Sequence, residues 1–126
     1  MDVSPLRRSI ASLERALAQE KDEFVRDSVI QRFEYTYEIS WKLLKRHLTL
    51  DEGAENIEPL SRKELFRVAA EKGLLDDVTR WFGYHRARNE TSHAYDEARA
   101  EEVYEAAKQF VADARELLTA LERRRG

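Results

Sequence analysis

Apolar residues recur at helical spacing along five stretches of this chain. Ser4 and Pro5 open the first stretch, with a capping residue followed by a proline at the first helical position. Its apolar positions are Leu6, Ile10, Leu13 and Leu17. The most regular stretch runs from about Phe24 to Leu48 and carries one stripe of large side chains: Ile30, Phe33, Tyr37, Trp41, Leu44 and Leu48. Steps of three or four residues predict one buried face on each helix.

Three further helices are predicted from their capping residues. Ser61, with Glu64 three residues later, forms a capping box, and Gly73 suits the end of the helix that follows. Either Asp76 or Asp77 caps a fourth helix, whose stripe contains Val78, Trp81, Phe82 and His85. Asp96 caps a fifth, whose stripe is Val103, Ala107, Phe110, Ala114, Leu117 and Leu121.

The remaining segments predict the overall class of fold. Residues 50–59 have no periodicity and are predicted to form one long loop, and no stretch alternates in the manner of a strand. The sequence therefore predicts an all-α protein, a four- to five-helix up-and-down bundle, with residues 1–126 in a single helical domain.

The composition of the chain excludes some kinds of binding site and disfavours others. The chain has no cysteine, which excludes disulfides and thiolate zinc sites. Its net charge of −3 argues against broad, non-specific binding of nucleic acid, although a small basic cleft is compatible with it. No apolar run approaches the roughly 18 residues of a membrane span, and no targeting segment is recognisable, so we expect a soluble cytoplasmic protein.

One short segment concentrates polar side chains: YHRARNETSHAYD, from Tyr84 to Asp96. Arg88 and His93 lie five residues apart, about 140° around an ideal helix, so they share a face only if the helix ends between them. Thr91 and Ser92 are poor helix formers, which favours such an end. Arg80 and His85 have the same spacing, but His85 continues an apolar stripe and is predicted to be a core or interface histidine.

Together with QRFEYTYEISWKLLKRHL (residues 31–48), the run RNETSHAYD resembles the HEPN superfamily, and specifically its nucleotidyltransferase substrate-binding branch. The resemblance covers nearly the whole chain. The family's pattern is an arginine, a polar residue, three variable residues, a histidine, one residue and a tyrosine. Those positions are occupied here by Arg88, Asn89, His93 and Tyr95.

The resemblance implies a metal-independent endoribonuclease that acts as a symmetric homodimer without a cofactor, with two motifs facing across one cleft. His93 would serve as acid or base, because a histidine pKa near neutrality suits both roles. Arg88 would hold the phosphate and stabilise transition-state charge, and Asn89 would orient the histidine or the phosphate. Two-fold symmetry would supply the second histidine.

The resemblance also implies a toxin–antitoxin pair. In related pairs a minimal nucleotidyltransferase antitoxin transfers AMP onto the tyrosine of the motif, which is Tyr95 here. A bulky anionic nucleotide two residues from His93 would fill the cleft and repel RNA phosphate. No phosphate-binding glycine loop occurs in this chain, so the transfer chemistry would belong to the partner.

Other interpretations stay open. The chain can be a non-catalytic accessory subunit that presents a substrate to a nucleotidyltransferase, and the negative net charge favours that reading. The motif can instead be a helix-end capping cluster or a polar seam. Tyr84, Tyr95 and Tyr104 can be interface aromatics, and Trp41 is predicted to be core. Glu90, His93 and Asp96 are not predicted to bind a metal, because no second histidine lies at ligand spacing.

Overall fold

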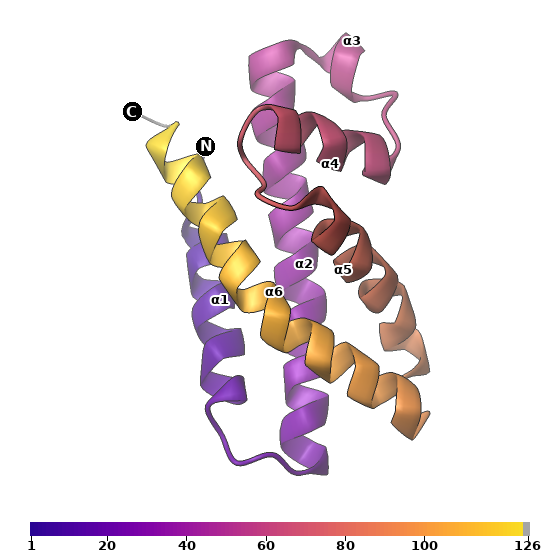
Figure 1. Ribbon diagram of the computed structural model, residues 1–126. Helices are drawn as coiled ribbons and strands as arrows, with labels where there is room; N and C mark the ends of the chain where they lie inside the picture. The colour runs from indigo at the N-terminus through magenta and orange to yellow at the C-terminus, as the bar shows by residue number, and fades with distance from the viewer. Residues whose placement is uncertain (125–126) are drawn as a thin grey trace.

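The computed structural model describes residues 1–124 and consists of helices and their connections. In chain order these are α1 (Ser4–Leu17), α2 (Glu23–Glu52), α3 (Ala54–Ile57), α4 (Arg62–Glu71), α5 (Val78–Glu90), a 3₁₀ turn (Thr91–His93) and α6 (Glu97–Arg123). Helices α1 and α2 lie side by side and antiparallel, α6 crosses both, and α4 and α5 pack along the other side of α2 (Figure 1). The all-α, up-and-down prediction is confirmed, with the four-residue α3 as an addition.

The predicted capping residues begin α4, α5 and α6, whereas the predicted cap Ser4 lies within α1, whose N-cap is Val3. Ser61 and Glu64 form the reciprocal capping box of α4, and the Asp77 carboxylate accepts hydrogen bonds from the first turn of α5. Asp96 does the same for α6. Gly73, two residues after α4, has a φ of 78°, which a residue without a Cβ adopts at little cost.

The predicted loop at residues 50–59 is wrong in part. Helix α2 continues to Glu52, and the amide of Gly53 still donates to the carbonyl of Thr49. Gly53 then ends the helix with a φ of 92°, and Ala54–Ile57 turn once more as α3. Ile57 is buried, so this turn covers the end of the core, a tertiary contact that no local periodicity announces.

One hydrophobic core joins α1, α2, α4, α5 and α6. All six predicted apolar positions of α6 are buried. Aromatic rings from four helices meet edge to face at its centre: Phe33, Tyr37, Phe66, Trp81, Tyr84 and Phe110. Such tilted arrangements suit the ring quadrupoles. The core therefore fixes α5 against α2 and α6.

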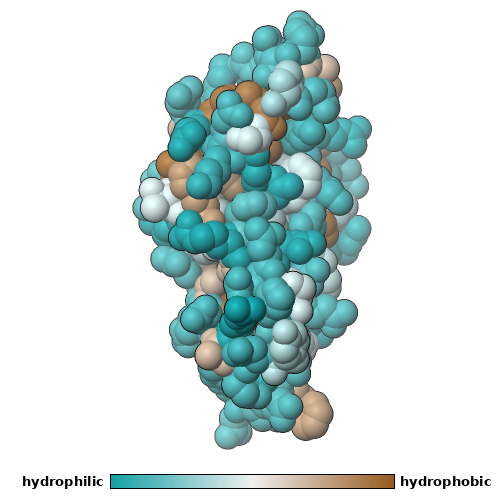
Figure 2. All heavy atoms as spheres, turned by 90° about the vertical axis from the view of Figure 1, so that its right-hand side faces the viewer, coloured by the Kyte–Doolittle hydropathy of each residue, from teal (hydrophilic) through white to brown (hydrophobic). Residues whose placement is uncertain are grey.

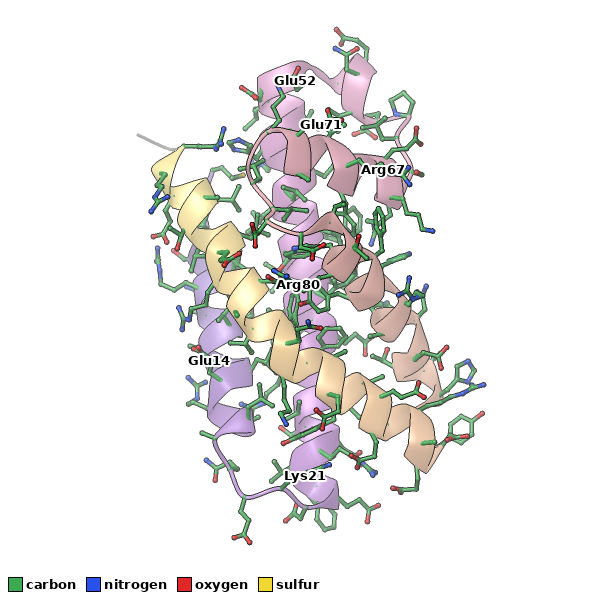
Figure 3. All side chains as sticks on the ribbon, viewed as in Figure 1. Glu14, Lys21, Glu52, Arg67, Glu71 and Arg80 are labelled. Carbon is green, nitrogen blue, oxygen red and sulfur yellow. The ribbon has the colours of Figure 1, made fainter. Side chains whose placement is uncertain are left out.

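A buried carboxylate ties α5 to α6 inside this core. Asp113 is only 4% exposed and accepts two hydrogen bonds from Arg80, from Nε and from Nη2, each at 2.8 Å. The Tyr84 hydroxyl donates to the same carboxylate. Burial and the neighbouring Asp113 raise the pKa of Tyr84 far above its ordinary value. Arg80 belongs to the first turn of α5 and reaches α6 from there (Figure 3).

The outer surface is mostly polar. The face on the right-hand side of Figure 1 is dominated by hydrophilic residues, with hydrophobic residues gathered mainly in its upper half (Figure 2). In the part of the chain that the structure describes, no helix combines the length and apolar character needed to cross a membrane.

We expect the Asp113→Ala substitution to lower the free energy of unfolding by about 3 kcal/mol, because it leaves the buried Tyr84 hydroxyl and the Arg80 guanidinium without their shared acceptor. Urea denaturation measures the change. The matched control is Glu105→Ala on α6, whose exposed carboxylate pairs with Lys108 alone among residues 1–124 and whose removal should change stability by no more than about 0.5 kcal/mol. Equal effects of the two substitutions would contradict this account of the core.

Candidate functional site

The motif turn, Arg88 to Asp96, connects α5 to α6. Arg88 lies in the last turn of α5, and the helix ends at Glu90, before the 3₁₀ turn that carries His93. The hydroxyl of Thr91 donates to the carbonyl of Arg88 at 2.7 Å, which competes with continued α-helix. The predicted helix end between Arg88 and His93 is therefore confirmed.

A buried arginine on α2 fixes the far side of the motif turn. Arg26 is 6% exposed and pairs with Glu97, the first residue of α6, as well as with Asp27 and Glu101. The hydrogen bond to Glu97 raises the pKa of Arg26 above its already high value, although burial opposes the shift. Asp96 caps the same turn of α6, so two interactions hold the α6 end of the motif turn.

Arg88 is held by carboxylates of α2. Its Nε donates to Glu38 Oε1 at 2.8 Å, and its Nη2 lies 3.7 Å from Glu34 Oε1. The other oxygen of Glu38 accepts from Trp41 Nε1 at 2.9 Å. Burial pushes the pKa of Glu38 upward, but the hydrogen bonds from Trp41 and Arg88 outweigh it and hold the pKa below its usual range. Glu38 is therefore an anion that orients the guanidinium of Arg88.

A second polar group adjoins this ion pair. The Tyr37 hydroxyl lies 2.8 Å from His85 Nδ1 and 2.9 Å from Arg62 Nη1. Since a guanidinium only donates, the tyrosine oxygen accepts from Arg62, and the same hydroxyl shares a hydrogen bond with Nδ1 of His85. Burial, then Arg62 and Arg88, lower the pKa of His85, and burial raises the pKa of Tyr37 to about 12. His85 is thus neutral near pH 7.

His93 and Tyr95 lie at the surface end of the motif turn. His93 is half-buried, and its Nδ1 atom is buried without a hydrogen-bond partner among residues 1–124. Its ring centroid lies 6.1 Å from that of Tyr95. Tyr95 is 84% exposed, so its hydroxyl is open to a modifying enzyme. Buried polar atoms in native proteins are nearly always paired, so the unpaired Nδ1 sets His93 apart from the other buried polar groups of the described chain.

The four predicted site residues lie on the motif turn, and the rings of His93 and Tyr95 adjoin each other, but no hydrogen bond between the four side chains is formed among residues 1–124. Within the described residues, neither Arg88 nor Asn89 donates a side-chain hydrogen bond to His93. Asn89 is exposed, and its backbone carbonyl accepts from Ser92. Arg80 and His85, the other pair at this spacing, diverge, because Arg80 reaches Asp113 on α6 and His85 reaches Tyr37 on α2.

Sequence reasoning missed Glu38 and Arg62 and misplaced Trp41. Trp41 was predicted to be core, yet it is only half-buried, and the Arg62 guanidinium lies 3.5 Å from its ring centroid. Tyr84 and Tyr104, considered as interface aromatics, are buried within the chain. The one available signal was the spacing of Glu38 and Trp41, three residues apart and hence on one helix face. Among residues 1–124 no group of three or more His, Asp or Glu is arranged to hold a metal ion.

These features define a helical bundle with a polar motif at the turn before its last helix, and known proteins share the fold. Residues 1–123 match the family model described as nucleotidyltransferase substrate binding protein like. The chain is 32% identical over 137 aligned positions to a Haemophilus influenzae protein named probable ribonuclease HepT, covering 98% of this chain and 94% of that one.

Two solved structures agree with this assignment. One, from Haemophilus influenzae, is described as the fold of a substrate-binding domain of a nucleotidyltransferase; it has a TM-score of 0.89 and 30% identity, and the match covers 96% of this chain and 99% of that one. The other, from Thermus thermophilus, has a TM-score of 0.79 and 31% identity over 92% and 98% of the two chains. The chain belongs to the nucleotidyltransferase substrate-binding branch of the HEPN superfamily.

Proposed function

We propose that this protein is a metal-independent endoribonuclease and that the motif turn is its cleavage site. The supporting observation is the turn itself: an arginine oriented by Glu38, followed after a helix end by a half-buried histidine whose Nδ1 has no partner within the described chain. The relative named probable ribonuclease HepT supports the same activity class.

The proposed reaction uses the 2′-hydroxyl of the RNA as nucleophile. A base removes its proton as O2′ bonds to phosphorus, and an acid protonates the 5′ oxygen as the P–O5′ bond breaks, which leaves a 2′,3′-cyclic phosphate. Imidazole suits both proton transfers near neutral pH. Arg88 donates from Nε to Glu38, and its Nη2 lies 3.7 Å from Glu34 without a hydrogen bond, so both terminal nitrogens would bind the phosphoryl oxygens as charge develops. Asn89, exposed beside it, would orient the phosphate.

We propose further that the active species is a two-fold dimer with the motif turns facing one another. One motif turn carries one histidine, whereas the reaction needs a base and an acid, and two-fold symmetry provides both. The 84% exposure of Tyr95 makes this turn suited to contacts from another molecule. The protein would act in the cytoplasm, where RNA is available.

A partner nucleotidyltransferase would silence the site through Tyr95, making the pair a toxin and its antitoxin. The Tyr95 oxygen would attack the α-phosphorus of ATP and release pyrophosphate, which leaves AMP on a ring 6.1 Å from that of His93. The added negative charge would repel an RNA phosphate.

The alternative is an accessory subunit that presents another substrate to that nucleotidyltransferase. The family description and the net charge of −3 favour this reading.

We expect His93→Ala to slow cleavage of single-stranded RNA in EDTA at least about 100-fold, because general acid–base catalysis contributes that much or more. Initial rates on a fluorophore–quencher RNA measure the effect. His47→Ala is the matched control, since His47 lies near the chain ends beside Met1 and Arg124 and should retain the wild-type rate.

Equal rates for wild type and His93→Ala would contradict the ribonuclease proposal and leave the accessory role. Light scattering on the same samples reports the state of assembly. A monomer that cleaves RNA at the wild-type rate would remove the paired-motif part of the mechanism.

The second expectation concerns modification. With the partner nucleotidyltransferase and α-labelled ATP, label should appear on the wild type and not on Tyr95→Phe. Tyr35→Phe, which changes another exposed tyrosine, should be labelled as fully as the wild type. Label on a third molecule, with none on this chain, would favour the accessory subunit.

A further inference from the structure

Arg62, the first residue of α4, is half-buried and has only neutral partners, a feature that it shares with Arg32 on α2, whose Nη1 donates to the Ser12 carbonyl. The guanidinium carbon of Arg62 lies 3.5 Å from the ring centroid of Trp41, and its Nη1 donates to the Tyr37 hydroxyl at 2.9 Å. His85 Nδ1 is 3.5 Å from the same atom. All three partners are neutral, and within residues 1–124 no carboxylate lies at ion-pair distance from Arg62.

Three other arginines of the bundle, unlike Arg62, contact carboxylates. Arg26 is surrounded by three carboxylates, Arg80 takes both oxygens of Asp113, and Arg88 pairs with Glu38. A cation removed from bulk water is costly unless a counter-charge or several acceptors compensate it. Arg62 is partly withdrawn from solvent without an anion in contact, so it is suited to one supplied by a ligand.

The guanidinium is also held ready for such a ligand. Stacking on Trp41 fixes its plane without using an N–H group, and only Nη1 has hydrogen-bond partners among the described residues. The remaining donors, on Nε and Nη2, match the paired oxygens of a phosphate. A group fixed before binding loses less conformational entropy when the ligand arrives.

Three further cationic side chains on α4 and α2 lie against aromatic rings and form, with Arg62, one basic surface. Lys63 and Arg67 lie over the Phe82 ring at 5.5 and 5.4 Å, and Lys42 lies 6.0 Å from the Trp41 ring. None of the three pairs with a carboxylate within the described chain, although the protein as a whole carries a net charge of −3. Arg67 lies toward the right-hand edge of the bundle in Figure 3, the side turned to the viewer in Figure 2.

This surface connects to the motif turn through two side chains. Arg62 stacks on Trp41, Trp41 donates to Glu38, and Glu38 accepts from Arg88. The two guanidiniums therefore flank Glu38, and both act on His85, whose pKa burial and then these cations depress. When one phosphate of a polyanion binds Arg88, a neighbouring phosphate of the same chain would lie near Arg62.

We infer that Arg62, with Lys63 and Arg67, is a second phosphate-binding subsite that holds the RNA strand beside the scissile phosphate at Arg88. The identity of the ligand rests on the proposed function. Cations interleaved with aromatic rings favour a flexible single strand, as in other sequence-tolerant binding surfaces. An acidic surface of the partner nucleotidyltransferase is the competing occupant, and the test separates the two.

The experiment measures binding of the wild-type protein to a fluorescein-labelled single-stranded 2′-O-methyl RNA, which lacks the nucleophile and is not cleaved. Fluorescence anisotropy over a series of salt concentrations gives both affinity and salt dependence. Arg62→Gln should weaken binding roughly tenfold and reduce the slope of log K against log salt by about 0.7, the value for one phosphate contact on a single strand. A residue that only supports folding would not change that slope.

Arg62→Lys keeps the charge but not the flat, stacked fork. It should retain the wild-type slope with an affinity reduced about threefold, because the bidentate geometry is lost. If circular dichroism shows that Arg62→Gln does not fold, Arg62→Lys is the variant that tests the subsite. The matched control is Arg8→Gln, an exposed arginine on α1 without an ion pair in the described chain, which should bind as the wild type does.

The outcomes separate this inference from the function on which it rests. Wild-type affinity and slope in Arg62→Gln, or wild-type affinity in Arg62→Lys, would overturn the subsite. The cleavage site would stand in that case if Arg88→Gln still weakens RNA binding. No binding by the wild type would overturn both. If Arg62→Gln no longer binds the purified partner nucleotidyltransferase but still binds RNA as the wild type does, the surface serves protein recognition and the RNA subsite is overturned.

Discussion

The ion pair between Glu38 and Arg88 is the constraint on which the site depends. It joins α2 to the last turn of α5 across fifty positions of sequence, at the point where the helix must stop. Its carboxylate is only about a quarter exposed and is further held by Trp41, so its geometry is better defined than that of a solvated surface pair. Without that anion, the guanidinium of Arg88 would have no fixed direction at the start of the motif turn.

The same fold uses arginine in two different ways. Arg80 is saturated by the buried Asp113 and stabilises the packing of α5 on α6, so nothing of its charge is left for a ligand. Arg88 commits one edge to Glu38, and Arg62 commits a single nitrogen to Tyr37. The difference distinguishes the two Arg-x₄-His spacings, of which the first lies within α5 and the second crosses the end of that helix. The two pairs have the same residue types and the same spacing, and they differ in the carboxylate that each arginine contacts.

Much of the fold could be predicted because its determinants are local. Capping residues such as Ser61, Asp77 and Asp96 act on backbone amides two or three positions away, and the stripe on α6 needs only a helical period. The site was predictable only in part. That the helix ends between Arg88 and His93 follows from Thr91 and Ser92, whereas the pairing of Arg88 with Glu38 depends on how α5 lies on α2. Arg62 comes from a third element, and its stacking on Trp41 has no local signal.

The most direct test of the account reverses the central ion pair. Glu38→Arg combined with Arg88→Glu keeps one guanidinium and one carboxylate in contact between α2 and α5 but moves the positive charge to the other helix. Metal-free RNA cleavage should fall at least about 100-fold in this double variant, because the oriented cation no longer lies on the motif turn, while the thermal midpoint stays near that of the wild type. A double variant that cleaves as fast as the wild type, or a wild type without any cleavage, would contradict the account.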